Sequence, residues 1–272
     1  MQDTTGSIWQ CPLCRSDLRP SASQGSWSCS SGHSFDTARE GYLHLLPVQK
    51  RKSRTPGDSK AMMQARRRFL EGGYYRPLTD ALNRHIPATG RLLDLGCGEG
   101  YYSRQIRRQA DPPAIFACDI SKDAVRLCAR GLDAAHSAVA SSFDLPVKPA
   151  SLEAVLTVFA PVKFAELARI LKPGGVFIRV SPGAGHLLQI RRQLYEQIKT
   201  DTGTAAAPEP FRLIADENVR FDFLPEDRQA MMALLAMTPH YWKARAEKKQ
   251  QLENQPPFSV SADFVLQVWQ RD

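Results

Sequence analysis

The sequence predicts an α/β protein with a doubly wound, seven-stranded sheet and a small metal-binding module at its N-terminus. From residue 91 onward, short apolar runs alternate with helical patterns, which is typical of β-α-β units. One of these runs, at 92–95, leads directly into a glycine-rich turn. The first 48 residues contain clustered cysteines and a histidine, and they show no helical period.

The expected elements of the large domain follow from this alternation. Strands are predicted at 91–95, 114–119, 136–140, 152–158 and 175–181. Helices are predicted near 100–109, 122–130, 162–171 and 185–199. A strand near 219–224, a helix at 226–236 and a final strand at 262–270 complete the sheet.

The composition and the hydrophobic pattern of the sequence divide the chain into three parts. Residues 1–48 form a compact module that is too small for a core of its own. Residues 49–84 begin as a basic linker and become a helix, which Asp58 or Ser59 can cap and which Gly72-Gly73 ends. Residues 85–272 are the α/β domain.

Composition points to a protein of the cytoplasm without a membrane span. No apolar run approaches the roughly 18–20 residues that cross a bilayer. The first ten residues lack the basic start and apolar centre of a secretory signal. In a reducing compartment, the six cysteines are not expected to form disulfides.

The net charge of +8 favours a polyanionic partner such as nucleic acid. Most of the excess lies between Lys50 and Arg68, where eight basic residues face one acid, Asp58. The basic residues are Lys50, Arg51, Lys52, Arg54, Lys60, Arg66, Arg67 and Arg68. A solvated helix face is the alternative explanation of this charge run.

The N-terminal module carries the spacing of a zinc site. Cys11 and Cys14 form a Cys-x2-Cys turn, and Cys29 and His33 follow after fourteen residues. A tight Cys-x-x-Cys turn lets two thiolates face one ion, and a second Cys/His pair completes a tetrahedron. Four protein ligands close the site, so its expected role is structural or recognitional.

The turn after the first predicted strand is suited to a nucleotide-like cofactor. Gly96, Gly98 and Gly100 allow the backbone to pass close to a ligand where a Cβ would collide. Asp94, at the end of the strand, can reach the amino-acid end of that ligand. The segment Asp94-Leu-Gly-Cys-Gly-Glu-Gly100 resembles the first motif of the S-adenosylmethionine-dependent methyltransferases.

Further segments fit the same superfamily in the same order. Asp119 ends the second strand, where a carboxylate can reach ribose hydroxyls. Ser141 begins a segment that resembles the adenine-edge segment, although the superfamily often has Asp there. Leu171-Lys-Pro-Gly-Gly175 resembles the turn before strand five, and 264–268 fits the closing antiparallel strand.

When the N-terminal module and the α/β domain are considered together, the chain resembles the bacterial 23S rRNA (guanine-N1)-methyltransferases. Its sequence is most similar to the branch of this family that is found in Gram-negative bacteria. The matching segments, besides the zinc knuckle and the glycine turn, are Phe35–Tyr42, Leu45–Gln49, Pro56–Ser59, Met62–Arg66, Gly73–Leu78, Ala160-Pro161, Pro182-Gly183, His186-Leu187 and Met237–Pro239.

The resemblance implies an enzyme that methylates N1 of a guanine in a hairpin loop of 23S rRNA. It implies zinc at Cys11, Cys14, Cys29 and His33, so that residues 1–48 would recognise RNA and residues 85–272 would be the methyltransferase domain. S-adenosylmethionine contacts would fall on Tyr75, on the turn Gly96-Cys97-Gly98 and on His186. The expected partner is the rRNA hairpin, and a second copy of the chain is a further candidate.

Several roles stay open at the level of sequence. The general base is not assigned: Asp144, His186 and bulk water are alternatives. Phe159 either stacks on an extruded base or packs the end of a strand. Two other functions compete with an rRNA methyltransferase, namely a small-molecule methyltransferase and a noncatalytic RNA-binding protein, but neither explains the zinc knuckle together with an intact glycine turn.

Overall fold

The computed structural model describes residues 6–21, 25–50, 57–132, 136–198 and 208–272. The strands of the large sheet are β4 (Leu43–His44), β5 (Arg91–Leu95), β6 (Ala114–Asp119), β7 (Ser137–Val139), β8 (Leu152–Val158), β9 (Leu171–Pro182), β10 (Phe211–Phe223) and β11 (Val260–Arg271). The helices are α1 (Lys60–Glu71), α2 (Arg76–Asn83), α3 (Tyr101–Ile106), α4 (Lys122–Ala129), α5 (Phe164–Ile170), α6 (Leu188–Leu194), α7 (Arg228–Ala236), α8 (Pro239–Lys243) and α9 (Ala246–Glu253).

The large sheet is doubly wound, as predicted. Its order within the described residues is β10-β11-β9-β8-β5-β6-β7-β4. The pairs from β9 to β4 are parallel, whereas β11 runs antiparallel to both β9 and β10. After β5, the chain forms β6 on one side of β5 in the sheet, and it later forms β8 on the other side of β5. The carboxyl ends of β5, β6 and β8 therefore flank the topological switch point, where such sheets bind ligands.

The seven strands β5 to β11 form the sheet that the sequence predicts, and β4 adds an eighth at its edge. Leu43 and His44 pair in parallel with Ala138 and Val139 of β7. A strand of two residues carries no period that sequence analysis could detect. Because β4 belongs to the N-terminal module, the module is joined to the large domain through the sheet itself.

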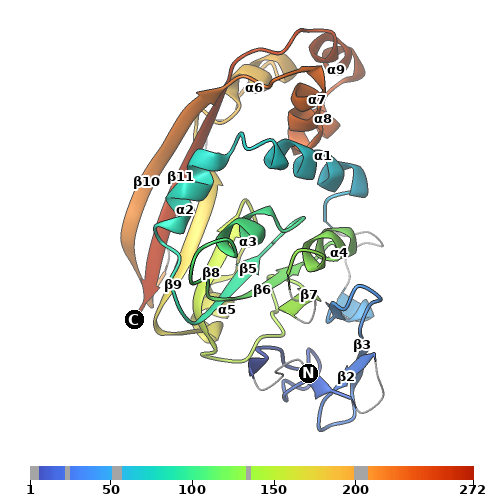
Figure 1. Ribbon diagram of the computed structural model, residues 1–272, viewed down its shortest axis with the longest axis vertical. Helices are drawn as coiled ribbons and strands as arrows, with labels where there is room; N and C mark the ends of the chain where they lie inside the picture. The colour runs from blue at the N-terminus through green and yellow to red at the C-terminus, as the bar shows by residue number, and fades with distance from the viewer. Residues whose placement is uncertain (1–5, 22–24, 51–56, 133–135, 199–207) are drawn as a thin grey trace.

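Helix α1 starts and ends where the sequence predicts. The Ser59 hydroxyl accepts a hydrogen bond from the Met62 amide at 3.3 Å, and Gly72 is the C-cap. Met63, Phe69 and Leu70 are buried on one face. As Figure 1 shows, α1 crosses between the sheet domain and the helices α7 and α8, so both of its ends lie beside other elements.

The C-terminal third differs most from the sequence prediction. Strand β10 extends over Phe211–Phe223 because it pairs along nearly its whole length with β11. The sequence did not predict α2, α8 or α9. Helix α9 buries only Leu252, so it has no apolar face that would produce a helical pattern.

The N-terminal module has a three-stranded antiparallel sheet, formed by β1 (Arg19–Pro20), β2 (Ser26–Ser28) and β3 (Ser34–Asp36). Its core is continuous with that of the large domain. Trp9 is fully buried and meets Phe116 of β6 edge-on, with ring centroids 6.1 Å apart. The Gln10 amide donates to the carbonyl oxygen of Pro146 at 2.9 Å.

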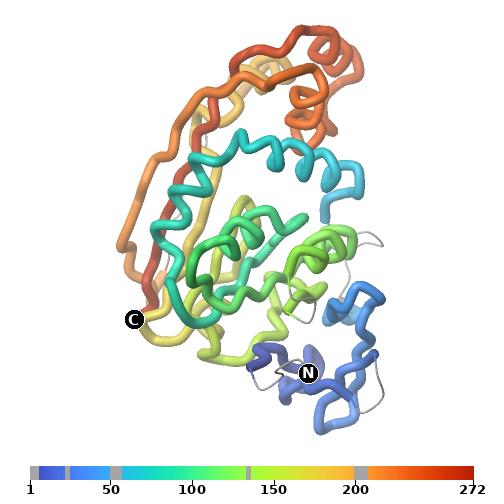
Figure 2. The backbone as a smooth tube through the Cα atoms, in the orientation of Figure 1, coloured from blue at the N-terminus to red at the C-terminus, as the bar shows by residue number. Residues whose placement is uncertain are grey.

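The molecule is elongated, and its two ends have different character. Helices α6 to α9 gather at one end, and the N-terminal module lies at the other (Figures 1 and 2). The long antiparallel pair of β10 and β11 forms one side of the molecule. Among the helices of the described residues, none is both long and apolar enough to span a membrane.

Candidate active site and metal centre

A cavity of about 620 Å³ opens at the carboxyl ends of the central strands. Its walls come from the ends of β5, β6, β8 and β9, from helix α1 and from the segment that joins α7 to α8. A cavity at this edge, within the size range of small-molecule sites, is where the doubly wound fold places its ligand.

The glycine turn after β5 forms the floor of the cavity. Gly96 and Gly98 have φ angles of +77° and +54°, which L-residues rarely adopt. A Cβ on Gly98 would meet only the Arg66 guanidinium, at 3.4 Å, so the space beside this glycine is open. A Cβ on Gly96 would lie 2.3 Å from that of Ala160, so Gly96 is required by the fold itself.

Two carboxyl groups, the buried Asp94 and the partly buried Asp119, flank this turn. Asp119 accepts hydrogen bonds from the Gly98 amide at 3.0 Å and the Ser121 amide at 2.8 Å, so it fixes the turn to the end of β6. Asp94 accepts from the Ser103 hydroxyl at 2.5 Å. Burial raises the pKa of Asp94 to about 7, against the opposing effect of the Ser103 bond.

Tyr75 and His186 close the cavity from the side of β11. The Tyr75 side chain is 1% exposed, its ring meets Phe264 edge-on at 5.0 Å, and its hydroxyl has no partner among the described residues. An unpaired buried hydroxyl is costly, and a bound ligand would satisfy it. His186 is 9% exposed, and burial lowers its pKa to about 3, so the imidazole is neutral.

The structure thus brings together seven of the eight residues that the sequence singles out for the cofactor. Tyr75, Asp94, Gly96, Cys97, Gly98, Asp119 and His186 all line the cavity. Ser141 is not among the lining residues, and its hydroxyl accepts from the Phe143 amide in a local turn. Ala140, Ser142 and Phe143 line the cavity at this place.

Arg66 lines the cavity, although the sequence placed it in the basic segment. Its guanidinium donates to Asp58 at 2.6 Å and to the Met237 carbonyl oxygen at 3.4 Å. Arg67 is also paired, with Glu71 at 2.8 Å. Lys60 and Arg68 are exposed, and Arg51, Lys52 and Arg54 lie outside the described residues.

His240 is the residue of the cavity wall that sequence reasoning missed. It follows Met237-Thr-Pro239, a segment that the family resemblance includes, but no local pattern distinguishes this histidine. Phe159 also lines the cavity, remains 47% exposed and lies 5.6 Å from His186, measured between ring centroids. Asp144 lies outside the lining and forms an ion pair with Arg15.

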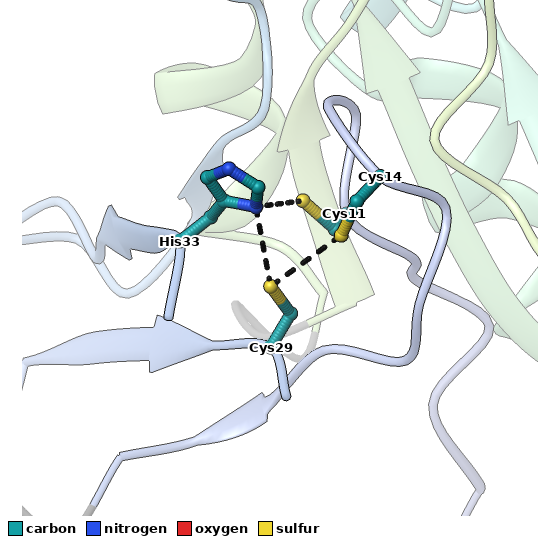
Figure 3. Close-up of side chains that lie close together, drawn as sticks. All are labelled: Cys11, Cys14, Cys29 and His33. Atoms are coloured by element: carbon teal, nitrogen blue, oxygen red, sulfur yellow. Dashed lines mark hydrogen bonds between the residues drawn. The ribbon is translucent and has the colours of Figure 1, made fainter. Parts of the chain in front are cut away.

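The four predicted metal ligands converge at the N-terminal module (Figure 3). Their ligand atoms lie within 4.8 Å of one another. The separations are 3.6 Å from Cys11 Sγ to His33 Nδ1, 3.6 Å from Cys14 Sγ to Cys29 Sγ and 3.4 Å from Cys29 Sγ to His33 Nδ1. A zinc tetrahedron with bonds of about 2.0–2.3 Å has edges of about 3.5–3.8 Å. The ligand set therefore fits zinc.

The electrostatics at Cys14 favour metal binding. Hydrogen bonds from Ser16 lower the pKa of Cys14 to about 5, so its sulfur is a thiolate at neutral pH, whereas burial raises the pKa of Cys11. A thiolate is the form that binds zinc. Because three cysteines and one histidine fill a tetrahedron, no coordination position is left for a reacting water, and the metal centre is structural.

The metal centre is connected to the cavity by one arginine. Arg15, next to Cys14, donates to the Leu145 carbonyl oxygen at 2.8 Å and pairs with Asp144. Both residues belong to the loop after β7, which also supplies Ser142 and Phe143 to the cavity. The zinc ligands thus support one wall of the cavity.

These features define the class of protein, which is an S-adenosylmethionine-dependent methyltransferase. They are a doubly wound sheet with a final antiparallel strand, a glycine turn after β5, and carboxyl groups at the ends of β5 and β6. A methyltransferase-domain model matches residues 92–175, and a zinc-ribbon model described as "RlmA, N-terminal" matches residues 9–54. A solved structure called "Conversion of a Disulfide Bond into a Thioacetal Group during Echinomycin Biosynthesis" has a TM-score of 0.50 at 17% identity, covering 72% of this chain and 82% of its own.

Two relatives identify the family more narrowly. The 23S rRNA (guanine(748)-N(1))-methyltransferase of Streptomyces fradiae is 33% identical over 86% of this chain and 85% of its own. The YxjB protein of Bacillus subtilis (strain 168), named provisionally as a 23S rRNA (guanine-N(1)-)-methyltransferase, is 30% identical over 96% of both chains. The chain belongs to the 23S rRNA (guanine-N1)-methyltransferase family, with S-adenosylmethionine and zinc as its cofactors.

Proposed function

We propose that this protein transfers a methyl group from S-adenosylmethionine to N1 of a guanine in a hairpin loop of 23S rRNA, in the cytoplasm. The observation that carries the proposal is full-length similarity to enzymes of this name, combined with a cavity at the switch point of the sheet. The methyl group on the sulfonium is already activated, so the chain must chiefly position, dehydrate and deprotonate the acceptor.

The cofactor is assigned to the glycine-turn half of the cavity. We assign Asp94 and Tyr75 to its methionine end and Asp119 to its ribose. The turn Gly96-Cys97-Gly98 passes beneath it, and His186 lies at the boundary with the acceptor. The unpaired Tyr75 hydroxyl and the open space at Gly98 support this assignment. Ser141 is retained only as a candidate that acts through its turn.

The acceptor guanine is assigned to the opposite half, beside Phe159 and His186. Phe159 has a φ of +59°, which is unusual for a residue with a side chain, and its ring remains half-exposed at the cavity wall. A strained and exposed aromatic at this position supports stacking on an extruded base over simple packing. The base must leave its stack to reach the methyl group.

We divide the chain into a zinc-binding recognition module at 1–48, a basic linker and helix at 49–84, and the methyltransferase domain at 85–272. We assign RNA binding to the module and to the basic linker and helix. Gly57 and Asp58 and helix α1 contribute to the cavity wall, and the cations of the basic segment and the module can contact phosphates. A homodimer would extend this surface, and sedimentation with and without a hairpin fragment tests for it.

The modified nucleotide identifies the function directly. Purified protein is incubated with labelled S-adenosylmethionine and 23S rRNA from a strain that lacks this gene, and the digested nucleosides are analysed by mass spectrometry. We expect 1-methylguanosine at a single hairpin position and negligible turnover of free guanosine or GTP. Methylation of a metabolite at comparable efficiency would support a small-molecule methyltransferase. Tight RNA binding with no methyl transfer would support a noncatalytic RNA-binding protein.

A further inference from the structure

Methylation of guanine at N1 requires a proton acceptor, because N1 carries a hydrogen that must leave as the new bond forms. General-base catalysis contributes typically 10²–10⁴-fold to such steps. The base must lie in the acceptor half of the cavity, must have a free lone pair and must be unprotonated at working pH.

The carboxyl groups of the cavity do not meet these conditions. Asp119 is bound to two backbone amides, and Asp94 to the Ser103 hydroxyl, both at the cofactor turn. Asp58 is paired with Arg66, and Glu99 with Arg104 at 2.8 Å. A carboxylate keeps further lone pairs when it accepts one or two hydrogen bonds, and Glu99 Oε1 has no partner among the described residues. These groups are therefore excluded by their position, because all four lie on the side of the cavity that we assign to the cofactor.

His186 is excluded by its own hydrogen bond and by burial. The Asp263 amide donates to its Nδ1 at 3.3 Å, so the ring proton is on Nε2 and no lone pair faces the cavity. Burial also lowers the pKa of His186 to about 3, which makes it a poor base near neutrality. It is a neutral donor rather than a proton acceptor.

We propose that His240 is the general base that accepts the guanine N1 proton, and that Tyr195 holds its imidazole in the required tautomer. The inference deepens the proposed function and rests on it. His240 lines the same cavity as Phe159 and His186, and it is near enough to His186 to lower the pKa of that imidazole. It is the histidine at the start of α8, and Tyr195 follows the end of α6.

The contacts of Tyr195 define the tautomer. Its hydroxyl lies 3.2 Å from His240 Nδ1 and 3.3 Å from the His240 carbonyl oxygen. A carbonyl oxygen only accepts, so both contacts are hydrogen bonds only if the hydroxyl donates to the carbonyl and Nδ1–H donates to the hydroxyl. That arrangement leaves the proton on Nδ1 and a lone pair on Nε2. Orientation of one ring nitrogen by a hydrogen bond on the other is a usual device of histidine catalysis.

The surroundings keep His240 neutral before the reaction. The titratable and charged groups that face it are Arg191 from α6, Tyr195 directly after α6, Lys243 from α8 and His186 after β9. Burial lowers the pKa of His240, and the positive charges of Arg191 and Lys243 lower it further. The imidazole therefore stays unprotonated at neutral pH and remains able to accept a proton.

The step balances in atoms and charge. The bond from guanine N1 to the methyl carbon forms while the bond from that carbon to sulfur breaks, and the N1 proton passes to His240 Nε2. The positive charge moves from the sulfonium to the imidazolium, which then releases its proton to water. Arg191 and Lys243 favour that release.

The test combines kinetics with a measurement on the free protein. His240→Gln should lower kcat by about 10²–10⁴-fold, while S-adenosylhomocysteine affinity and the KM for a hairpin substrate stay near wild type. In the wild type, kcat should fall as pH drops below 6.5 through the lowered pKa of His240, and this acid limb should be absent from the variant. His85→Gln is the matched control, because His85 pairs with Glu217 outside the cavity.

Imidazole ¹⁵N chemical shifts report the tautomer without cofactor or RNA. We expect a protonated Nδ1 and a bare Nε2 on His240, and loss of this preference in Tyr195→Phe, with a smaller loss of kcat than in His240→Gln. A wild-type kcat or a retained acid limb in His240→Gln overturns the assignment, as does an Nε2–H tautomer in the wild type. A wild-type protein that produces no 1-methylguanosine in rRNA overturns the proposed function, and this inference with it.

Discussion

At the scale of single residues, backbone amides and buried side chains organise the cavity more than exposed charges do. Asp119 ties the glycine turn to β6, and Asp263 fixes His186 through a backbone amide and binds Gly185 N–H at 2.7 Å. These bonds hold the wall in place before any ligand arrives. Preorganisation of this kind lowers the cost of binding.

Gly98→Val should abolish S-adenosylhomocysteine binding, measured by calorimetry, because the new side chain enters the open space above the turn. The matched control is Gly174→Val. Gly174 has a φ of +77° and no atom near its Cβ position, so that variant carries similar backbone strain away from the cavity. Equal affinity in both variants would remove the assignment of the turn to the cofactor.

The burial of His186 predicts an acid sensitivity of folding. Its pKa is lowered to about 3 in the folded state against 6.5 when unfolded. Between these values the unfolded chain binds a proton that the folded chain does not, so stability decreases as pH falls, by up to about 1.4 kcal/mol per pH unit. Urea unfolding between pH 4 and 7 should show a shallower decrease for His186→Gln. Identical pH slopes would contradict burial of a neutral imidazole.

At the scale of elements, the N-terminal module and the large domain are one packing unit. Trp9 and Cys29 share a core with Leu93 and Phe116 of the central strands, and β4 adds to the sheet. Arg15 links the metal knuckle to the loop at the cavity. A change in the module should therefore reach the large domain.

Cys29→Ala should remove the single zinc, measured by elemental analysis of protein purified without added metal. It should also lower Tm by about 4–8 °C, because a loss of about 2 kcal/mol corresponds to a shift of roughly that size in a domain of about 150–250 residues. Cys118→Ala, at a buried cysteine outside the cluster, should keep the zinc. A metal-free Cys29→Ala protein with unchanged Tm would show that the module does not support the fold.

At the scale of the whole molecule, the charge distribution predicts how RNA is held. Affinity for an rRNA hairpin should fall linearly on a log–log salt plot, because phosphate contacts release counterions. Reversal of Arg51, Lys52 and Arg54 to Glu should weaken binding and flatten the slope by about 0.9 for each lost contact. Cofactor affinity should not change.

The control reverses Arg107, Arg108 and Arg130, which are exposed and follow the ends of α3 and α4. Helices of a doubly wound sheet begin at its carboxyl edge and end at the opposite edge, away from the cavity. A salt slope that both triple variants change equally would favour a general charge effect over a defined RNA-binding segment.

The parallel part of the sheet and the zinc ligands were predictable because each follows from a short-range signal. Strands β5, β6 and β8 have the predicted bounds and are mainly apolar, as is typical of parallel strands that are buried on both faces. The four metal ligands follow from spacing alone. Two-residue β4, the extended β10 and the polar α9 carry no such signal, because long-range pairing and packing define them.

The sequence by itself determined the class of fold, the glycine turn, the carboxyl groups ending β5 and β6 and the four zinc ligands, since each depends on neighbours in the chain. Only the tertiary structure decided which distant groups share the cavity. It paired Arg66 with Asp58, removed Asp144 from the wall through Arg15, and brought Tyr195 against His240. Protonation and tautomer depend on burial and on partners far along the chain, and these exist only after folding.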